Sequence, residues 1–348
     1  MLQFITKKIL YGLLVLAGVV VMVFFLFQGF GDPARLVLGQ SGDAKTINNI
    51  RQQLGLDKPK WQQFLLYAND VSPIAIHSTK EIETKQLKGF FIGSNNTKIG
   101  IKLPYLRRSY QTKKEVTDVL FEALPGTIIL AFTAMLIATV IGILLGVLAA
   151  VKQNTIYDTG SIFASVLGIS APSFFMGIIL AYLFGFVLSH YTGLSMTGSL
   201  YDIDAFSGKH LQLKNLILPA ITLGIRPLAI IVQLTRSAML DVLEQDYIRT
   251  AYAKGLSKRA VIFKHALRNA LNPVITAITG WFAELLAGAF FVEYIFGWKG
   301  IGKVTVDALE KLDFPVVMGS VLITATFFIL VNILADVLYS IVDPRVKL

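Results

Sequence analysis

The sequence predicts an all-α membrane protein in which six helices cross the bilayer. The chain of 348 residues is 54% hydrophobic and only 16% charged, which is too little charge to cover the surface of a soluble protein of this length. Six segments are long and apolar enough to cross a hydrocarbon layer of about 30 Å, which takes about 20 helical residues. These segments are 9–30, about 123–150, about 160–188, about 216–236, about 270–292 and about 317–341.

The first predicted helix begins after Lys7 and Lys8 and ends near Phe30. Its apolar run is longer than the core of a signal peptide, and no small-residue cleavage site follows it. We therefore expect a helix that stays in the membrane. The expected domain organisation is a cytoplasmic end with this helix over 1–30, an extracytoplasmic segment over 31–118, a five-helix core over 119–343 and a cytoplasmic tail over 344–348.

Residues 31–118 form the one long segment between predicted spans, and we expect it to mix helix and strand. Apolar residues recur at helical spacing over 46–70, which predicts an amphipathic helix packed against the membrane helices. The candidate buried residues are Ile47, Ile50, Leu54, Trp61, Phe64, Leu65 and Tyr67. Further along, two short runs, KGFFIG and KIGIKL, flank the polar turn SNNT and predict a β-hairpin.

Prolines mark two of the remaining spans. Pro172 lies within the third span, and we expect a kink there because proline lacks a backbone N–H donor and clashes with the preceding turn. Arg226 and Pro227 interrupt the apolar run of the fourth span, which makes it the weakest of the six by composition.

Lys and Arg are distributed unevenly between the short loops, and this distribution indicates the orientation. With the N-terminus inside, twelve of these residues lie on the cytoplasmic side and five lie outside. Short cytoplasmic loops carry the excess of positive charge in membrane proteins. We therefore expect both termini to be cytoplasmic, as an even number of spans requires.

The longest cytoplasmic loop, 238–269, contains two short helical patterns. Ala238 to Lys254 has apolar residues at helical spacing, and a basic stretch from Lys258 to Asn269 leads into the fifth span. Gly255 separates the two patterns and supplies backbone freedom that other residues lack. Two hinged helices on the membrane face can form a docking surface for a partner. A solvated helical hairpin that only follows the positive-inside rule is an equally good interpretation of the periodicity.

The stretch GWKGIGKV, residues 297–304, nearly matches a phosphate-binding glycine loop. Val304 stands where the loop needs Ser or Thr to hold magnesium, and a membrane helix, not a strand, precedes it. The predicted orientation also places it outside the cell, away from ATP. We expect a glycine-rich outer turn with Trp298 at the membrane interface.

Three charged residues lie at membrane depth in the predicted spans: Arg226, Glu284 and Asp336. A buried charge is costly and must find a partner, so such residues often mark ion pathways. Arg226 and Glu284 come to similar depths on consecutive antiparallel spans, and one hypothesis is that they form an ion pair. Alternatively, Arg226 meets carbonyl groups freed by Pro227 or an acid on another chain, while Glu284 faces a wet cavity.

The sequence lacks the residues that disulfides, thiolate metal sites and intramembrane catalytic sites require. The chain has no cysteine, which excludes disulfides and thiolate metal sites. Its four histidines show neither a zinc-protease pattern nor a serine pairing, which argues against an intramembrane enzyme. An ion-coupled secondary transporter that uses the intramembrane charges remains the alternative function.

The stretch DYIRTAYAKGLSKRAVIFKHALRNALNP resembles the coupling loop of permease subunits of ATP-binding-cassette (ABC) importers, in the dipeptide, oligopeptide and nickel family and of its first permease type. The general form of this loop is Glu-Ala-Ala-x-x-x-Gly. Here Arg249, Thr250 and Ala251 precede Gly255, so the acidic residue is absent, as is the usual Ile-x-Leu-Pro ending. Other segments similar to the family, in the same order, are GDPARLVLG, LGLDKPKWQQFLLY, SAPSFFMGIILAYLFG, LILPAITLG, VEYIFGWKGIG and ADVLYSIVDPRVKL.

The resemblance implies the type I ABC importer permease fold in a bacterial plasma membrane. The implied partners are a second homologous permease subunit, two ATPase subunits and an extracytoplasmic substrate-binding protein. ATP and magnesium would be bound by the ATPases, with no cofactor in this chain. Closure of the ATPases on ATP would move the coupling loop and turn the path outward. The residues implied at this coupling site are Asp246, Tyr247, Arg249, Ala251, Lys254, Gly255, Leu256, Lys258 and Arg259.

The resemblance leaves the cargo open among dipeptides, oligopeptides, nickel and related small solutes. Tyr247, Ala251 and Leu256 would fill a groove of the ATPase, while Lys254, Lys258 and Arg259 would pair with acids at its rim. The outer stretch 70–100 is longer than the usual family loop. It either helps to seat the binding protein or is a passive cap on the outer surface.

Overall fold

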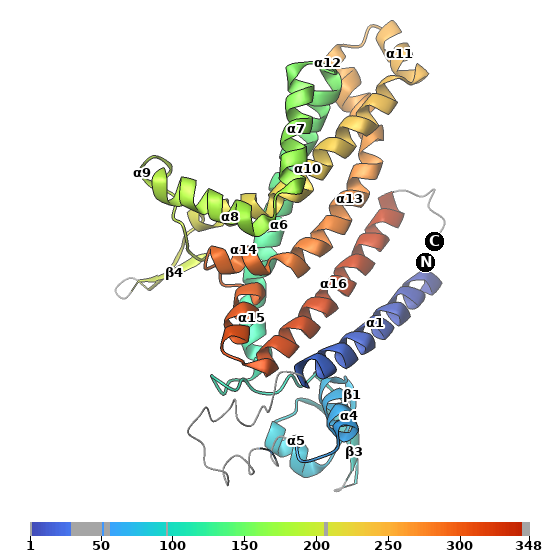
Figure 1. Cartoon of the computed structure of the whole chain (residues 1–348). Helices are drawn as coiled ribbons and strands as arrows, with labels where there is room; N and C mark the ends of the chain where they lie inside the picture. The colour runs from blue at the N-terminus through green and yellow to red at the C-terminus, as the bar shows by residue number, and fades with distance from the viewer. Residues whose placement is uncertain (1, 29–50, 52–55, 95–96, 205–207, 343–348) are drawn as a thin grey trace. The chain divides into compact units, whose positions relative to one another are not determined.

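The computed structural model describes residues 2–28, 51, 56–94, 97–204 and 208–342 (Figure 1). The chain forms two compact units. Unit 1 comprises Met1–Lys8, Leu124–Lys303 and Phe327–Leu348, and unit 2 comprises Ile9–Ala123 and Val304–Thr326. Each unit is described by itself. The predicted residues Ile47, Ile50 and Leu54 lie outside the described part.

Four helices in the described part are long and apolar enough to cross a membrane. The spanning stretches are Gln3–Leu26 of α1 (Leu2–Gln28), all of α6 (Val116–Val151) and α10 (Lys214–Leu243), and Phe314–Val337 of α16 (Phe314–Val342). A fifth is a bent pair. The remaining predicted span corresponds to α13 (Leu267–Gly288), whose 22 residues suffice in length, but which is not among the candidates. The number six is therefore not reproduced by length and composition alone.

The predicted break at Pro172 is confirmed and is larger than a kink. Helix α7 (Ile156–Ser170) ends before Pro172, and α8 (Ser173–Tyr182) continues into a π-helical turn over Leu183–Val187. The chain bends by 108° between the two halves. Ala171 has extended backbone geometry, as the residue before a proline prefers.

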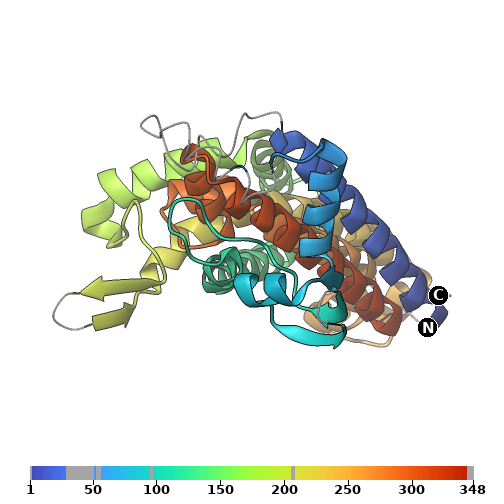
Figure 2. The same ribbon diagram turned by 90° about the horizontal axis from the view of Figure 1, so that it is seen from below.

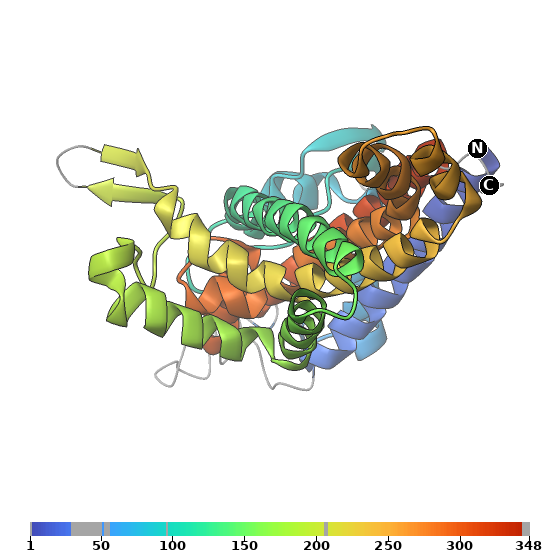
Figure 3. The ribbon, with the colours of Figure 1, turned by 90° about the horizontal axis from the view of Figure 1, so that it is seen from above.

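The fourth predicted span is confirmed as a helix, since α10 runs unbroken through Pro219 and Pro227. It packs against α7, α8 and α13, and prolines are tolerated in membrane helices that are surrounded by neighbours in this way. Figure 3 shows α10 beside α7 and α13. Small residues allow equally close contact with α6, where Gly142 faces Ile231 and Gly146 faces Thr235.

Three short segments connect α10 to α13 at one end of unit 1. They are α11 (Asp246–Ala253), α12 (Lys258–Ala260) and a π-helical turn, η3 (Val261–Ala266). At the other end, α13 leads to α14 (Phe290–Ile295) and α15 (Ile301–Glu310). A short helix, α9 (Ser189–Thr192), precedes the antiparallel pair β4 (Tyr201–Asp204) and β5 (Gly208–Leu211), which projects as a hairpin in Figure 2.

Unit 2 contains a small α/β assembly. It consists of α4 (Lys60–Val71), β1 (Ile74–His77), α5 (Thr79–Lys85), β2 (Gly89–Gly93) and β3 (Lys98–Lys102). The sheet order is β1-β3-β2, with both pairs antiparallel. The hairpin predicted from KGFFIG and KIGIKL is confirmed, with Gly89 opposite Lys102 and Gly93 opposite Lys98.

Helix α4 packs on α1 through two of its predicted apolar residues. Tyr67 stacks on Phe24 with ring centroids 5.7 Å apart, and Phe64 meets Phe24 edge-on at 5.3 Å. Trp61 and Leu65, also expected to be buried, are exposed. The helical period is therefore right, but the buried stripe is narrower than the sequence suggested.

Candidate functional site

The loop between α10 and α13 folds onto the helices rather than extending from them. Ile248 and Ala251 of α11, with Val261 of η3, are buried in one apolar cluster with Val147 of α6 and Met239 of α10. Movement of α11 is therefore transmitted to two long helices through direct packing.

The expected single helix from Ala238 to Lys254 is wrong. Helix α10 ends at Leu243, and Gln245 is extended before α11 begins at Asp246. Asp246 lies in the first turn of α11, where a carboxylate stabilises the positive end of the helix. The separate short helix has its own orientation, so different side chains face outward than a continuous helix would present.

Gly255 ends α11 in the left-handed conformation, with φ +78°. Its N–H donates to the Tyr252 carbonyl at 2.9 Å, and the N–H of Leu256 donates to the Ala251 carbonyl at 3.3 Å. A Cβ at this position would meet no atom within 4 Å. The requirement for glycine is therefore conformational rather than steric, which agrees with the hinge predicted from the sequence.

Most of the predicted coupling residues are available on the surface of the chain. Tyr247 and Leu256 are 43% and 40% exposed. The other exposed members are Asp246, Arg249, Lys254, Gly255, Lys258 and Arg259. Ala251 is the exception, because it is 7% exposed and packs inside the chain. Its contact with an ATPase stays a prediction, and within the chain its role is packing.

Two interactions organise the exposed residues. Asp246 and Arg249 form a surface pair at 3.5 Å, which contributes little because both side chains are solvated. The Tyr247 hydroxyl accepts a hydrogen bond from Asn269 Nδ2 at 3.0 Å, which ties α11 to the first turns of α13. Tyr247 therefore has a role within the chain as well as an exposed ring.

A buried ion pair that the sequence did not indicate lies between α7 and α10. Arg236 Nε donates to Asp158 Oδ1 at 2.5 Å and Nη2 donates to Oδ2 at 2.8 Å. The Asn154 N–H donates to the same carboxylate at 2.9 Å. The Asp158 side chain is 4% exposed and that of Arg236 22%. The partners are 78 residues apart in sequence, so no local pattern signals this two-bond contact.

The intramembrane charges do not pair as hypothesised. The structure contains no direct ion pair between Arg226 and Glu284, and both are exposed on this chain. The Arg226 guanidinium instead lies 5.8 Å from the ring centroid of Trp281, at cation–π distance. Asp336 pairs with Lys8 of α1 at 2.7 Å. The sequence placed the charges at similar depths but could not give the directions of their side chains.

Trp298 lies in the stretch 297–304, which nearly matches a phosphate-binding loop. It is fully buried, so its expected place at the membrane interface is wrong. Its Nε1 donates to the Gly126 carbonyl on α6 at 2.9 Å. The turn wraps around a second buried residue, Glu293, whose carboxylate accepts from Thr127 at 2.7 Å. The glycine pattern therefore belongs to internal packing of unit 1.

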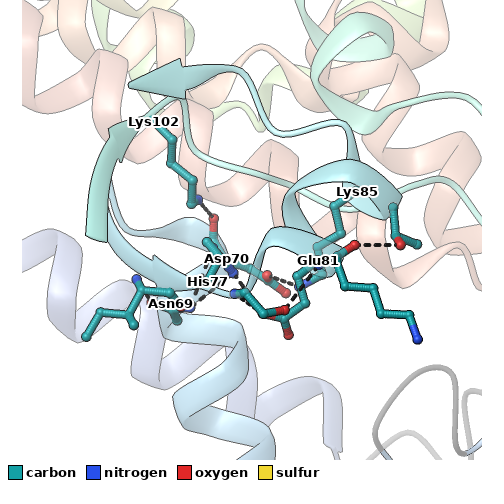
Figure 4. A network of polar contacts seen from close by, with 10 residues as sticks. Asn69, Asp70, His77, Glu81, Lys85 and Lys102 are labelled. Carbon is teal, nitrogen blue, oxygen red and sulfur yellow. Dashed lines mark hydrogen bonds and ion pairs between the residues drawn. The ribbon is translucent and has the colours of Figure 1, made fainter. Parts of the chain in front are cut away.

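A polar network holds the α/β assembly of unit 2 together (Figure 4). Buried Asp70 accepts from Lys85 at 2.5 Å and pairs with Arg107 at 3.5 Å, and Lys102 Nζ donates to the Asp70 backbone carbonyl. Burial lowers the pKa of the Lys102 ammonium to about 8. Burial, helped by Lys85, also lowers the pKa of His77. These contacts fix the position of the sheet against α4 and α5.

Comparison with known proteins supports a transport role. Residues 142–348 match the model of binding-protein-dependent transport system inner membrane components, and residues 1–84 match the model of the N-terminal part of such components. The chain is 38% identical to a di/tripeptide transport system permease of Pseudomonas aeruginosa (strain UCBPP-PA14), covering 100% of this chain and 99% of the relative. It is 37% identical to a dipeptide transport permease and 35% identical to a glutathione transport permease of Escherichia coli (strain K12), again over 100% of this chain and 99% of each relative.

Solved structures show the same fold at lower similarity. A chain of the methionine ABC transporter MetNI, in an inward-facing conformation, superposes with a TM-score of 0.50 and 17% identity. The match covers 65% of this chain and 97% of that one. The fold is thus the type I ABC importer permease fold. By its family matches and its full-length similarity to the permeases, the chain belongs to the family of binding-protein-dependent transport system inner membrane components, as a membrane-spanning permease subunit of an ABC importer and not an enzyme.

Proposed function

We propose that the importer containing this subunit carries short peptides. The observation that carries this proposal is the full-length similarity to permeases named for di- and tripeptides, dipeptides and glutathione, itself a tripeptide derivative. The chain would form half of the path, beside a second homologous permease subunit. An extracytoplasmic binding protein would deliver the cargo.

The exposed surface of α11 and α12 would be the dock for an ATPase subunit. It combines the rings of Tyr247 and Tyr252 with the basic side chains of Lys254, Lys258 and Arg259. Aromatic residues that fill a groove and basic residues at a polar rim suit a protein interface. Two ATPases would bind ATP and magnesium, and this chain would hold no cofactor. Both termini would lie in the cytoplasm, with the helices in the bacterial plasma membrane.

Reconstitution tests the cargo and the energy source together. The chain is co-expressed with the other subunits encoded beside it and purified by a tag on this chain alone. Proteoliposomes are then given labelled dipeptide, glutathione or Ni²⁺, with ATP or with a proton gradient. ATP-dependent dipeptide uptake with co-purified ATPases is expected. Uptake by the sole chain on a proton gradient would instead support the secondary transporter.

Lys303→Ala is expected to leave ATP hydrolysis by the assembled importer unchanged, because the nucleotide sites would lie on other chains. Lys303 contributes its backbone N–H to Glu293 at 3.2 Å, and alanine keeps that donor. The measurement is the ATPase rate of wild-type and variant complexes at equal assembly. Loss of nucleotide binding by a fully assembled variant would show that the turn 297–303 binds ATP after all.

The outer sheet would help to seat the binding protein. Ile74, Ile101 and Phe90 face one another across the three strands, as do Ile76, Ile99 and Ile92. All six are more than half exposed, and Leu103 extends the face with 65% exposure. A contiguous exposed apolar face of this kind marks an interaction site. The family depends on a binding protein, and this sheet lies outside every candidate span, so that protein is the occupant we propose.

Substitutions on this face give a sharper test than deletion of 70–100, which would remove the sheet and the Asp70 network together. Ile99→Thr with Ile101→Thr keeps β-branched residues in the central strand while removing apolar surface. We expect affinity of the assembled permease for its purified binding protein to fall at least about tenfold, equal to about 1.4 kcal/mol. The matched control is Glu83→Thr on exposed α5. Unchanged affinity for the binding protein would contradict the proposal that this face seats it. A variant that keeps this affinity but binds lipid vesicles less well would also contradict it.

A further inference from the structure

Glu293 is a fully buried carboxylate at the centre of the turn 297–303. Thr127 of α6 donates to its Oε1 at 2.7 Å, and the backbone N–H groups of Gly302 and Lys303 donate to the carboxylate, the latter at 3.2 Å to Oε2. The N–H of Ile301 donates to the Thr127 hydroxyl at 2.9 Å. One side chain thus joins α14, the first turn of α15 and α6.

Two glycines make room for this carboxylate. A Cβ built on Gly300 would collide with the Glu293 carboxylate. A Cβ on Gly302 would collide with the Phe290 backbone and come within 2.9 Å of Glu293 Oε2. The spacing of the glycines is therefore set by an anion inside the chain. Backbone N–H groups in such turns favour negative charge whether it is a phosphate or a carboxylate.

Opposing effects set the pKa of Glu293. Burial raises its pKa to about 7, and the Thr127 hydroxyl with the two N–H groups counteracts part of this increase. No charged side chain contributes to the shift among the described residues. The ionisable residues on the surrounding elements are Tyr294 on α14, Lys299 on the turn, Lys303, Asp307 and Glu310 on α15, Tyr182 on α8, Lys214, Arg226, Arg236 and Asp241 on α10, and Asp118 and Glu122 on α6.

Both protonation states can satisfy the cradle, but they use Thr127 differently. The ionised carboxylate accepts from the hydroxyl and from both N–H groups. The neutral acid keeps one oxygen as acceptor for the N–H groups and turns its own O–H toward the hydroxyl, which must then donate elsewhere. We propose that Glu293 is a positioning residue that fastens the turn 297–303 to α6 through Thr127, and that this fastening differs between its protonated and ionised forms.

Thermal unfolding of the full-length chain in the assembled importer tests the proposal. The folded state keeps the Glu293 proton up to about pH 7, whereas the unfolded chain loses it near its usual pKa of 4.5. Stability is therefore expected to fall as pH rises between these values and to level off above about pH 7. Glu293→Gln, whose amide copies the neutral acid, is expected to remove this component. A Gln variant with the wild-type pH profile would overturn the proposal.

Variants of Thr127 keep the test decisive even if Glu293→Gln does not fold. Thr127→Val removes a donor that favours the ionised form of Glu293. The pH midpoint of the fall in thermal stability is therefore expected to move to higher pH. Thr127→Ser restores the hydroxyl and should restore the midpoint. Glu122→Gln on the exposed face of α6 is the matched control and should keep the wild-type profile. An unmoved midpoint in Thr127→Val would contradict the assignment to this cradle.

The uptake rate gives the functional readout. A carboxylic acid whose pKa lies near 7 goes from mostly neutral to mostly ionised across neutral pH. Wild-type uptake is expected to change with a midpoint near pH 7, and Glu293→Gln to lose that midpoint. This arm rests on the proposed transport function, whereas the unfolding arm needs no cargo. Wild-type uptake without this midpoint would show that the fastening has no part in transport.

Discussion

Gly255→Pro is expected to abolish ATP-driven uptake while leaving the chain in the membrane at its normal level. The native φ of +78° is inaccessible to proline, which is fixed near −65°, and the N–H that bonds to Tyr252 is lost. Lys254 also has ψ near 4°, a conformation that a residue before proline avoids. The end of α11 must therefore rearrange, and the docking surface changes direction relative to α10 and α13. Uptake into proteoliposomes and the amount of inserted chain are the two measurements.

Gly255→Ala separates conformation from bulk. Alanine meets nothing within 4 Å at this position and pays only for left-handed backbone, about 1–2 kcal/mol. It should keep measurable uptake. ATP hydrolysis that continues in the proline variant without uptake would locate the defect in coupling. Normal uptake in the proline variant would count heavily against a docking role for α11 and α12.

Asp158→Ala is expected to cause a large loss of stability. Arg236 would keep a largely buried guanidinium with no acid beside it, and the Asn154 N–H would lose its acceptor. Removing one partner of such a pair leaves the other charge without its counterion, which is destabilising. Because Asp158 joins the start of α7 to α10, the loss should appear as lower thermal stability and reduced insertion.

A double variant distinguishes an unpaired charge from lost packing. Asp158→Leu with Arg236→Met removes both charges and keeps apolar volume, so it should recover much of the stability lost in either single variant. Asp241→Ala, an exposed acid on α10, is the control and should change stability by no more than about 0.5 kcal/mol. Equal stability of Asp158→Ala and this control would show that the ion pair is not needed.

The elements that follow from local chemistry could be predicted from the sequence. Long apolar runs gave α1, α6 and α16, two strand patterns around a polar turn gave the β2–β3 hairpin, and Pro172 marked the break between α7 and α8. Gly255 was identifiable because glycine adopts the left-handed conformation that ends a helix more readily than other residues do. In each case the determining interaction lies within a few residues of the chain.

The contacts that assemble the site could not be predicted in this way. Arg236 finds Asp158 across 78 residues, and Glu293 finds Thr127 across 166. Trp298 was expected at the interface from its type alone, but the Gly126 carbonyl on α6 offers its indole N–H a buried acceptor. The direction of a charged side chain, as for Arg226 above Trp281, depends on which ring or acid another helix supplies.

The sheet of β1, β3 and β2 has a consequence for how the cell produces this protein. Strands β1 and β2 are both edges, and beside them the stretch from Gly89 to Gly93 contains three large apolar residues and no charge. Unpaired edges beside apolar faces invite strand-to-strand association between copies. Chains made in excess over their partners would therefore aggregate through these edges or be degraded. Balanced synthesis of the subunits, as from one polycistronic message, would keep the population of orphan chains small.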